Sequence, residues 1–80
     1  MYHIYVLRSL SSGKRYVGLT CLYPEERLKQ YNYGSNKWSK ANKPFELIYS
    51  ESYLDKTRSR RRELFLKTGQ GRRVLDNLVK

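Results

Sequence analysis

Five polar side chains in this 80-residue sequence have types and spacings that suit chemistry on a phosphodiester. They are two tyrosines eleven residues apart (Tyr5 and Tyr16), the pair Arg27 and Tyr31, and Glu63. Cleavage of such a bond needs a proton acceptor near the attacking water, a cation at the developing negative charge and a Lewis acid at the leaving oxygen. An arginine can stabilise that charge through its forked N–H donors. We therefore treat these five residues as a candidate catalytic set.

The tyrosines and the glutamate can take these roles only under stated conditions. A tyrosine accepts a proton only if nearby cations lower its pKa below the usual value of about 10, which an arginine and a metal ion can do. A single glutamate such as Glu63 can anchor one hydrated Mg²⁺, because this ion keeps most of its waters. The chain has only seven acidic residues, which argues against a two-metal carboxylate cluster. A one-metal scheme with Mg²⁺ or Mn²⁺ remains open.

Each residue also has a simpler interpretation. The tyrosines can be ordinary sheet residues, because strands favour tyrosine. Arg27 can pair with Glu26 or cover apolar surface, and Glu63 can form an i,i+4 ion pair with Lys67.

Three other residue types could take part in chemistry. The single histidine, His3, is an alternative base. The single cysteine, Cys21, is expected to be a small and partly buried apolar residue. The single tryptophan, Trp38, can stack on a base or pack under its loop, and the sequence leaves both open.

The first half of the chain predicts a hairpin followed by a helix. Residues 2–9 and 15–20 are rich in β-branched and aromatic side chains, and the Ser-Ser-Gly segment 11–13 is typical of a turn. If that turn is tight, Tyr5 and Tyr16 lie beside each other on one face. Residues 24–34 predict a helix that begins with a proline and ends at a glycine. Spacing of i,i+4 puts Arg27 and Tyr31 on one face of it.

The second half predicts a loop, a strand and two helices. Residues 35–44 are polar and basic and predict a loop. Residues 45–53 predict a third strand, with Phe45, Leu47 and Tyr49 alternating against Glu46, Ile48 and Ser50. A long helix is expected from Asp55 to about Thr68, with Gly69 and Gly71 breaking it before a final short helix over 72–79. The element order is therefore β-β-α-β-α-α, an α+β fold in which helices flank a small antiparallel three-stranded sheet, within one domain over residues 1–80.

The charge of the chain indicates a polyanionic partner. Seventeen basic residues against seven acidic ones leave a net charge of +10. Between residues 56 and 73 there are eight basic residues and a single acid, Glu63, which favours a face that contacts phosphates over a solvated helix of mixed sign. The candidate phosphate-contacting residues are Lys14, Arg60, Arg61 and Lys67.

Several classes of site and location are excluded or unexpected. One cysteine and one histidine exclude an internal disulfide, a multi-cysteine zinc site and a His-rich metal centre. No apolar run approaches the roughly 20 residues of a membrane span, and no secretory signal is expected at the N-terminus. We therefore expect a protein of the cytoplasm that does not bind membranes.

The order of these motifs resembles the GIY-YIG nuclease superfamily, in its short stand-alone bacterial form. The resemblance covers about residues 2–70 and is carried by five segments: His3-Ile4-Tyr5, Tyr16-Val17-Gly18, Glu26-Arg27-Leu28 with Tyr31, Lys43-Pro44 through Leu47-Ile48-Tyr49, and Arg61-Arg62-Glu63. Five elements in order, at compatible spacing and in a basic chain of suitable length, make the resemblance fairly specific.

The resemblance implies a role for each matching residue. Tyr5 is the candidate base beside the attacking water, and Tyr16 orients that water or the phosphate. Gly18 permits close backbone approach. Arg27 holds the phosphate, Tyr31 adds a contact to the phosphate or water, and Glu63 binds the divalent metal.

Three positions depart from the pattern. His3 replaces the first glycine of the name motif, Leu19 stands where some members have a lysine, and neither Gln70 nor Asn77 clearly matches a late asparagine.

The expected function is metal-dependent endonucleolytic hydrolysis of DNA by a one-metal mechanism, with a place in DNA repair; DNA is favoured over RNA as the substrate, and the sequence leaves both open. The chain leaves no room for a separate DNA-targeting domain, so weak sequence specificity is expected. One alternative is a catalytically inactive nucleic-acid-binding module with the same fold. Another is a subunit whose basic face docks on an acidic protein, which would bind DNA weakly and with little dependence on salt.

Overall fold

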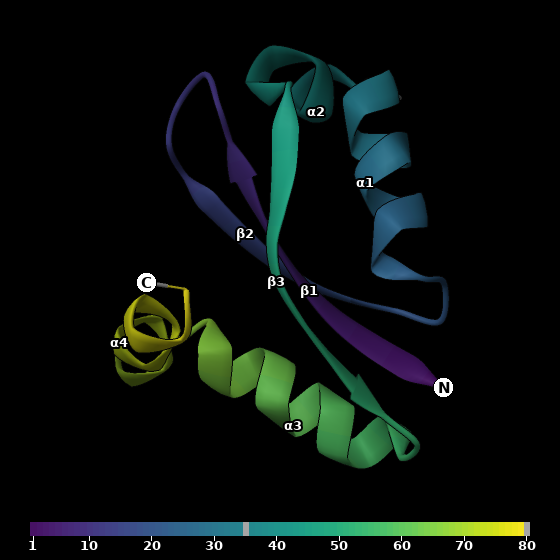
Figure 1. The fold of residues 1–80 in the computed structure, drawn as a ribbon, viewed down its shortest axis with the longest axis vertical. Helices are drawn as coiled ribbons and strands as arrows, with labels where there is room; N and C mark the ends of the chain where they lie inside the picture. The colour runs from purple at the N-terminus through teal and green to yellow at the C-terminus, as the bar shows by residue number, and fades with distance from the viewer. Residues whose placement is uncertain (35, 80) are drawn as a thin grey trace.

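The computed structural model describes residues 1–34 and 36–79 and has the predicted α+β architecture. Strands β1 (Tyr2–Ser9), β2 (Arg15–Thr20) and β3 (Phe45–Tyr53) form one antiparallel sheet in the order β2-β1-β3 (Figure 1). The helices are α1 (Pro24–Tyr33), α2 (Lys37–Asn42), α3 (Lys56–Leu66) and α4 (Gly69–Leu78). The predicted sheet, its three strands and the order of the main elements are confirmed. Among the described residues, no helix is long and apolar enough to cross a membrane.

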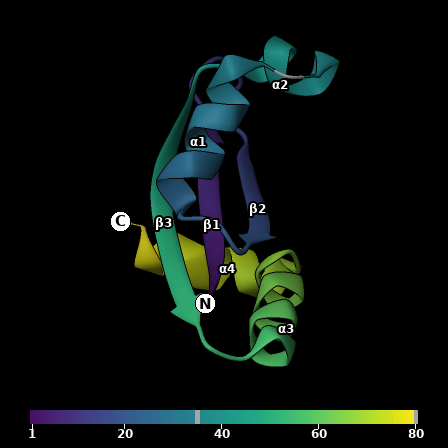
Figure 2. The same cartoon turned by 90° about the vertical axis from the view of Figure 1, so that its right-hand side faces the viewer.

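The sheet separates two apolar clusters, because β1 is the central strand and alternates its side chains between the two faces. Ile4 and Val6 pack with Leu66 of α3 and Leu75 of α4. On the opposite face, Tyr5, Leu7 and Phe45 form the second cluster, against which Leu28 and Tyr31 of α1 pack. Figure 2 shows α1 in front of the strands and α4 behind them. Helix α1 and the α3–α4 pair thus cover different faces.

The segment over residues 35–44, expected to be a loop, contains the short helix α2 instead. Its N-cap residue Asn36 accepts a hydrogen bond from the backbone N–H of Ser39, while the Ser39 hydroxyl accepts one from the Asn36 backbone N–H. This reciprocal cap satisfies two free donors at the helix start and stabilises a single turn in polar sequence. A serine in place of the usual Glu or Gln makes the pattern hard to recognise. Ser35 lies outside the described residues.

The predicted alternation along β3 is wrong beyond Leu47. The register shifts between Val6 and Leu7, so that Leu7 pairs with Leu47 and Val6 pairs with Tyr49. Such a bulge adds one residue to β3 and moves every later side chain to the opposite face. Tyr49 therefore packs with Ile48 on the Ile4–Val6 cluster instead of joining Phe45 and Leu47.

The boundary between α3 and α4 also differs from the prediction. Asp55 caps α3 through a hydrogen bond from the Thr57 N–H, as its leading position suggested. Gly69 and Gly71, however, do not separate the helices but form the first turn of α4, which is capped by Thr68. Gly71 is buried, and a Cβ at this position would collide with the carbonyl oxygen of Phe65 and the Cα of Leu66. The glycine is needed because the two helix backbones meet here.

Replacing Gly71 by Ala should therefore destabilise the protein. The obstruction is backbone, so the chain has to shift, and we expect a loss of about 1–3 kcal/mol in the free energy of unfolding. Gly69→Ala is the matched control, because a Cβ there meets nothing within 4 Å. Urea denaturation of both variants gives the comparison. Equal stability of the two variants would contradict the close approach of α3 and α4.

Candidate active site

Arg27 joins two tyrosines that come from different elements. Its Nε and Nη2 atoms lie 3.4 and 3.3 Å from the hydroxyl oxygen of Tyr5, to which they donate. The hydroxyl oxygens of Tyr5 and Tyr31 are 3.1 Å apart. The guanidinium carbon lies 5.6 Å from the ring centre of Tyr5 and 5.1 Å from that of Tyr31. Nη1 donates to the Gln30 carboxamide at 2.6 Å. The guanidinium is thus held in one orientation by three side chains, as a phosphate-binding arginine requires.

The protonation states of Tyr5 and Arg27 follow from their burial and from their contacts with each other and with Tyr31. Burial raises the pKa of Tyr5 to about 12, and the hydrogen bond with Tyr31 adds to the rise, whereas Arg27 acts in the opposite direction. Burial alone would lower the pKa of Arg27, but the hydrogen bond to Tyr5 and the electrostatic interactions with Tyr5 and Tyr31 together outweigh burial and raise that pKa. Arg27 therefore stays cationic. Arg27 does lower the pKa of Tyr5, as expected of a nearby cation, but burial raises this pKa by more. The phenol of Tyr5 therefore keeps its proton at neutral pH.

Gly18 makes room for the ring of Tyr5. The two residues are direct partners in the β1–β2 ladder, and a Cβ at position 18 would collide with the hydroxyl and ring of Tyr5. The direct partner of Tyr16 is Leu7. The two tyrosines share one face of the hairpin, as predicted, but they are diagonal rather than directly opposite neighbours, because the Ser9 N–H bonds the Lys14 carbonyl and closes a longer connection than a tight turn.

Tyr16 is connected to Tyr31 through an aromatic group that the sequence did not reveal. The ring of Trp38 lies edge-on to Tyr16 at 4.5 Å and to Tyr31 at 5.7 Å, and stacks on Phe45 at 5.8 Å. The Tyr16 hydroxyl donates to Asn42 Oδ1 at 3.3 Å. Trp38 and Asn42 both belong to α2. Because the sequence predicted a loop here instead of a helix, it did not predict these contacts. Trp38, the single aromatic residue in the polar segment 36–42, was the available signal.

Glu63 lies on helix α3, which packs on the other face of the sheet from the Tyr5–Arg27–Tyr31 group. It lies on the buried stripe of α3 with Ser59 and Leu66 and is 4% exposed. Its Oε2 accepts from Lys67 Nζ at 3.2 Å, so the simpler i,i+4 pair forms, and its Oε1 accepts from Arg60 Nη1 at 2.6 Å. Within residues 1–34 and 36–79, no hydrogen bond joins Glu63 to the Tyr5–Arg27–Tyr31 group.

The rotation of α3, and with it the placement of Glu63, is fixed by the neighbouring residue Arg62. Its guanidinium makes a two-pronged ion pair with Glu51 of β3, at 3.0 Å for both Nε–Oε1 and Nη2–Oε2. The hydroxyls of Tyr49 and Tyr53 also donate to this carboxylate. Burial alone would raise the pKa of Glu51, but hydrogen bonds from Arg62 and both tyrosines outweigh it and lower that pKa. The ion pair therefore persists at neutral pH.

The residues present fit one hydrated divalent cation rather than a metal bound by several protein ligands. The described residues contain no group of three or more His, Cys, Asp or Glu side chains that could hold a metal ion. Glu63 offers the hard oxygen atoms that Mg²⁺ prefers. The side chains of Arg60 and Lys67 are 59% and 48% exposed, so both can turn into solvent and free these oxygens without disturbing the core.

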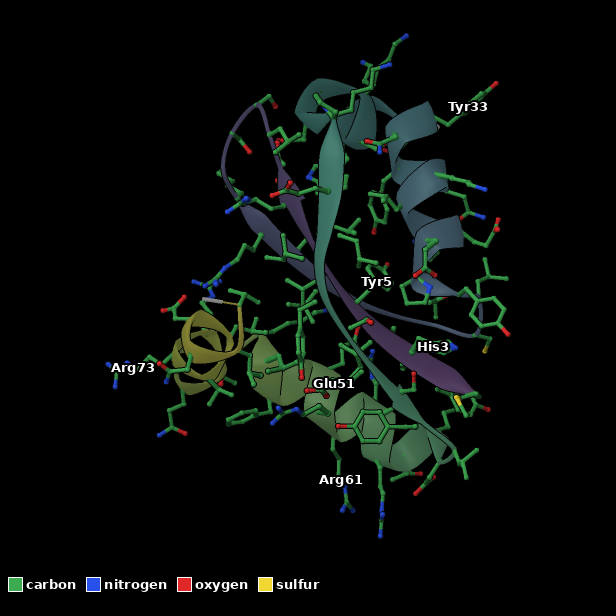
Figure 3. The ribbon with its side chains drawn as sticks, in the orientation of Figure 1. His3, Tyr5, Tyr33, Glu51, Arg61 and Arg73 are labelled. Atoms are coloured by element: carbon green, nitrogen blue, oxygen red, sulfur yellow. The ribbon has the colours of Figure 1, made fainter. Side chains whose placement is uncertain are left out.

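A basic hollow links Tyr16 to the Glu63 ion pair. Its volume is about 450 Å³, and Lys14, Tyr16, Lys67 and Arg72 are among the residues that line it. Lys67 is also the ion-pair partner of Glu63. Two of the predicted phosphate-contacting residues thus meet here, and Arg60 lies against Glu63. Arg61, in contrast, is exposed and extends from α3 away from the protein (Figure 3).

The remaining candidate residues lie outside this arrangement. The Nδ1 atom of His3 is 2.9 Å from the Ser52 hydroxyl oxygen on β3, and the ring is buried. Cys21, which was expected to be partly buried, is exposed, because it falls in the connection that follows β2. Gln70 and Asn77 are exposed on α4.

Comparison with known proteins gives one match. The family model of the GIY-YIG catalytic domain matches residues 1–74. No curated protein and no solved structure matches the chain.

Proposed function

Because the chain belongs to the GIY-YIG catalytic domain family, which is a family of endonucleases, we propose that it is a metal-dependent endonuclease that hydrolyses phosphodiester bonds in DNA. The observation that supports this most directly is the contact of Arg27 with Tyr5 and Tyr31, because it brings together residues from two of the matching segments, one on β1 and one on α1.

In the proposed reaction, Arg27 binds the scissile phosphate. Its guanidinium is preorganised by Tyr5, Tyr31 and Gln30, so it needs no reorganisation when negative charge develops on the phosphate oxygens. Tyr31 and Tyr16 add contacts to the phosphate or the attacking water. Tyr5, as a protonated phenol, positions Arg27 and the water and does not remove a proton from it. Gly18 keeps Tyr5 in place.

The proposed cofactor is one Mg²⁺ or Mn²⁺ held by Glu63 after Arg60 and Lys67 have released its oxygens. Such an ion supplies Lewis-acid stabilisation of the leaving oxygen. Lys14 and Lys67, on either side of the basic hollow, contact the phosphates next to the cleaved one, and Arg60 and Arg61 extend this contact along α3. The net charge of +10 supports a nucleic-acid partner.

A nuclease assay tests the proposal. Duplex, single-stranded and branched DNA and RNA are incubated with the protein in Mg²⁺, Mn²⁺ or EDTA, beside an Arg27→Ala variant purified identically to exclude contaminating nucleases. We expect cleavage of DNA that requires metal and is lost in the variant. Binding that is sensitive to salt, without cleavage of any substrate, would favour the second candidate, an inactive binding module. The observation that favours this alternative is that both Glu63 oxygens already accept from cations.

Tyr5→Phe should lower the rate of cleavage by about 10–100-fold, because it removes the hydroxyl that accepts from Nε and Nη2 of Arg27, and a hydrogen bond to a charged group contributes about 1.5–3 kcal/mol. Since burial raises the pKa of Tyr5 to about 12, the phenol keeps its proton between about pH 6 and 10. The wild type and the variant should then show the same pH dependence in that range. An ionisation seen in the wild-type pH–rate profile and missing in Tyr5→Phe would instead identify Tyr5 as the base.

A further inference from the structure

A hollow of about 550 Å³ lies beside the candidate active site, between the end of α1 and the start of α2. This volume is typical of sites that bind small molecules or parts of larger ligands. Arg27 and Tyr31 form part of its wall, together with Lys29, Gln30, Tyr33 and Trp38. A ligand group in the hollow would therefore lie next to the guanidinium that binds the scissile phosphate.

Trp38 gives this hollow a rigid aromatic wall. Its indole is 42% exposed, although three aromatic rings, those of Tyr16, Tyr31 and Phe45, pack against it. A tryptophan that is held by its neighbours and still partly exposed is prepared for stacking, because little freedom is lost when a flat ligand covers it. Tyr33 adds a second aromatic side chain, 83% exposed, at the end of α1 (Figure 3).

The charge of the hollow suits a nucleotide. Arg27 and Lys29 contribute two cations, and none of the described residues that line the hollow is Asp or Glu. The acid nearest to Lys29 is Glu26, at 3.9 Å between two largely exposed side chains, and such a pair is too weak to neutralise the lysine. An aromatic surface beside cations is the combination that binds single-stranded nucleic acid, since a base stacks while its phosphate meets the charge.

We propose that this hollow receives one unpaired nucleobase of the strand being cleaved, stacked on Trp38, while the adjoining phosphate lies on Arg27; the inference rests on the proposed nuclease function. A base inside a duplex has both faces covered by its neighbours and cannot enter unless it leaves the stack. The substrate class is therefore DNA that is single-stranded, or locally unpaired, next to the cleaved bond.

A binding experiment in EDTA tests the proposal without cleavage. The probes are a short oligothymidylate, an abasic deoxyribose-phosphate strand of equal length, and a duplex of equal length. Trp38 is the only tryptophan, so its fluorescence reports directly on the hollow. We expect the oligothymidylate to quench this fluorescence and to bind about tenfold more tightly than the abasic strand. The duplex should bind without quenching.

Variants separate stacking from general charge attraction. Trp38→Ala and Tyr33→Ala should reduce the preference for the oligothymidylate over the abasic strand. Tyr23→Ala should retain it, because Tyr23 is also exposed, at 71%, but does not line the hollow. If Trp38→Ala does not fold, the wild-type quenching and Tyr33→Ala still decide. Equal binding of the two single strands by the wild type, or unchanged fluorescence, would overturn the proposal.

The binding experiment and the nuclease assay distinguish a failure of the proposed base site from a failure of the proposed nuclease function. If the protein cleaves no substrate but prefers the oligothymidylate, the base-binding role of the hollow is supported and the proposed nuclease function is wrong. If the protein cleaves DNA with metal but binds both single strands equally, the nuclease function is supported and the base-binding role of the hollow is wrong.

Discussion

Glu63→Gln should reduce metal-dependent cleavage by on the order of 10³-fold, because a metal ion acting as a Lewis acid contributes several kcal/mol and each 1.36 kcal/mol is a factor of ten in rate. The substitution keeps the shape of the side chain on the buried stripe of α3 but replaces one carboxylate oxygen by an N–H donor group. Binding of DNA should persist, since Arg60 and Lys67 lose their ion-pair partner and become free to contact phosphates.

The control for this variant is Glu46→Gln, which removes a carboxylate that is paired with Arg8 on the sheet, outside the candidate site. Cleavage rates are measured in single-turnover conditions at several Mg²⁺ concentrations, and circular dichroism checks that both variants fold. Retained activity in Glu63→Gln would remove the proposed metal site, even if the chain is a nuclease. Loss of activity in Glu46→Gln as well would show that the effect is not specific to Glu63.

Arg27→Ala should lower the rate of cleavage by about 10²–10³-fold, the effect of removing one preorganised donor to a developing negative charge. Arg27→Lys should recover only part of this, because an ammonium group cannot span the positions of Nε and Nη2 that contact Tyr5. The loss should appear in the rate at saturating DNA more than in affinity, since the rest of the basic surface is intact.

Arg73→Ala provides the comparison for Arg27, because it removes the same charge from a side chain that extends into solvent from α4 (Figure 3). Both variants are measured at the same ionic strength, so that the general loss of one positive charge cancels. If Arg27→Lys were as active as the wild type, charge alone would suffice and the fixed fork would have no role. Equal losses in Arg27→Ala and Arg73→Ala would assign the effect to overall charge.

Sequence reasoning predicted the sheet and the grouping of Arg27 with Tyr31, because both follow from short-range periodicity. Strand and helix periods alone place these residues on defined faces. The contact of Arg27 with Tyr5 required, in addition, that α1 pack on the face of the sheet that carries Tyr5. The order of the motifs made that arrangement expected.

The features that were missed depend on long-range or backbone geometry. The bulge that moves Tyr49 to the other face is a property of the pairing of β3 with β1, not of β3 itself. The role of Gly71 appears only once the backbones of α3 and α4 meet. The raised pKa of Tyr5 results from its burial, which no spacing in the sequence reports. The simple ion pair of Glu63 with Lys67 is present, and the metal role of Glu63 stays a prediction that requires Lys67 and Arg60 to release the carboxylate.

The contact between Tyr5 and Gly18 has a consequence for how this chain can evolve. The ring of Tyr5 occupies the place where a Cβ at position 18 would lie. Substitutions at these two positions therefore depend on each other. A descendant that gains a side chain at position 18 first has to shorten the one at position 5, and so passes through an ancestor without the aromatic hydroxyl. Descendants that keep the tyrosine are therefore expected to keep the glycine.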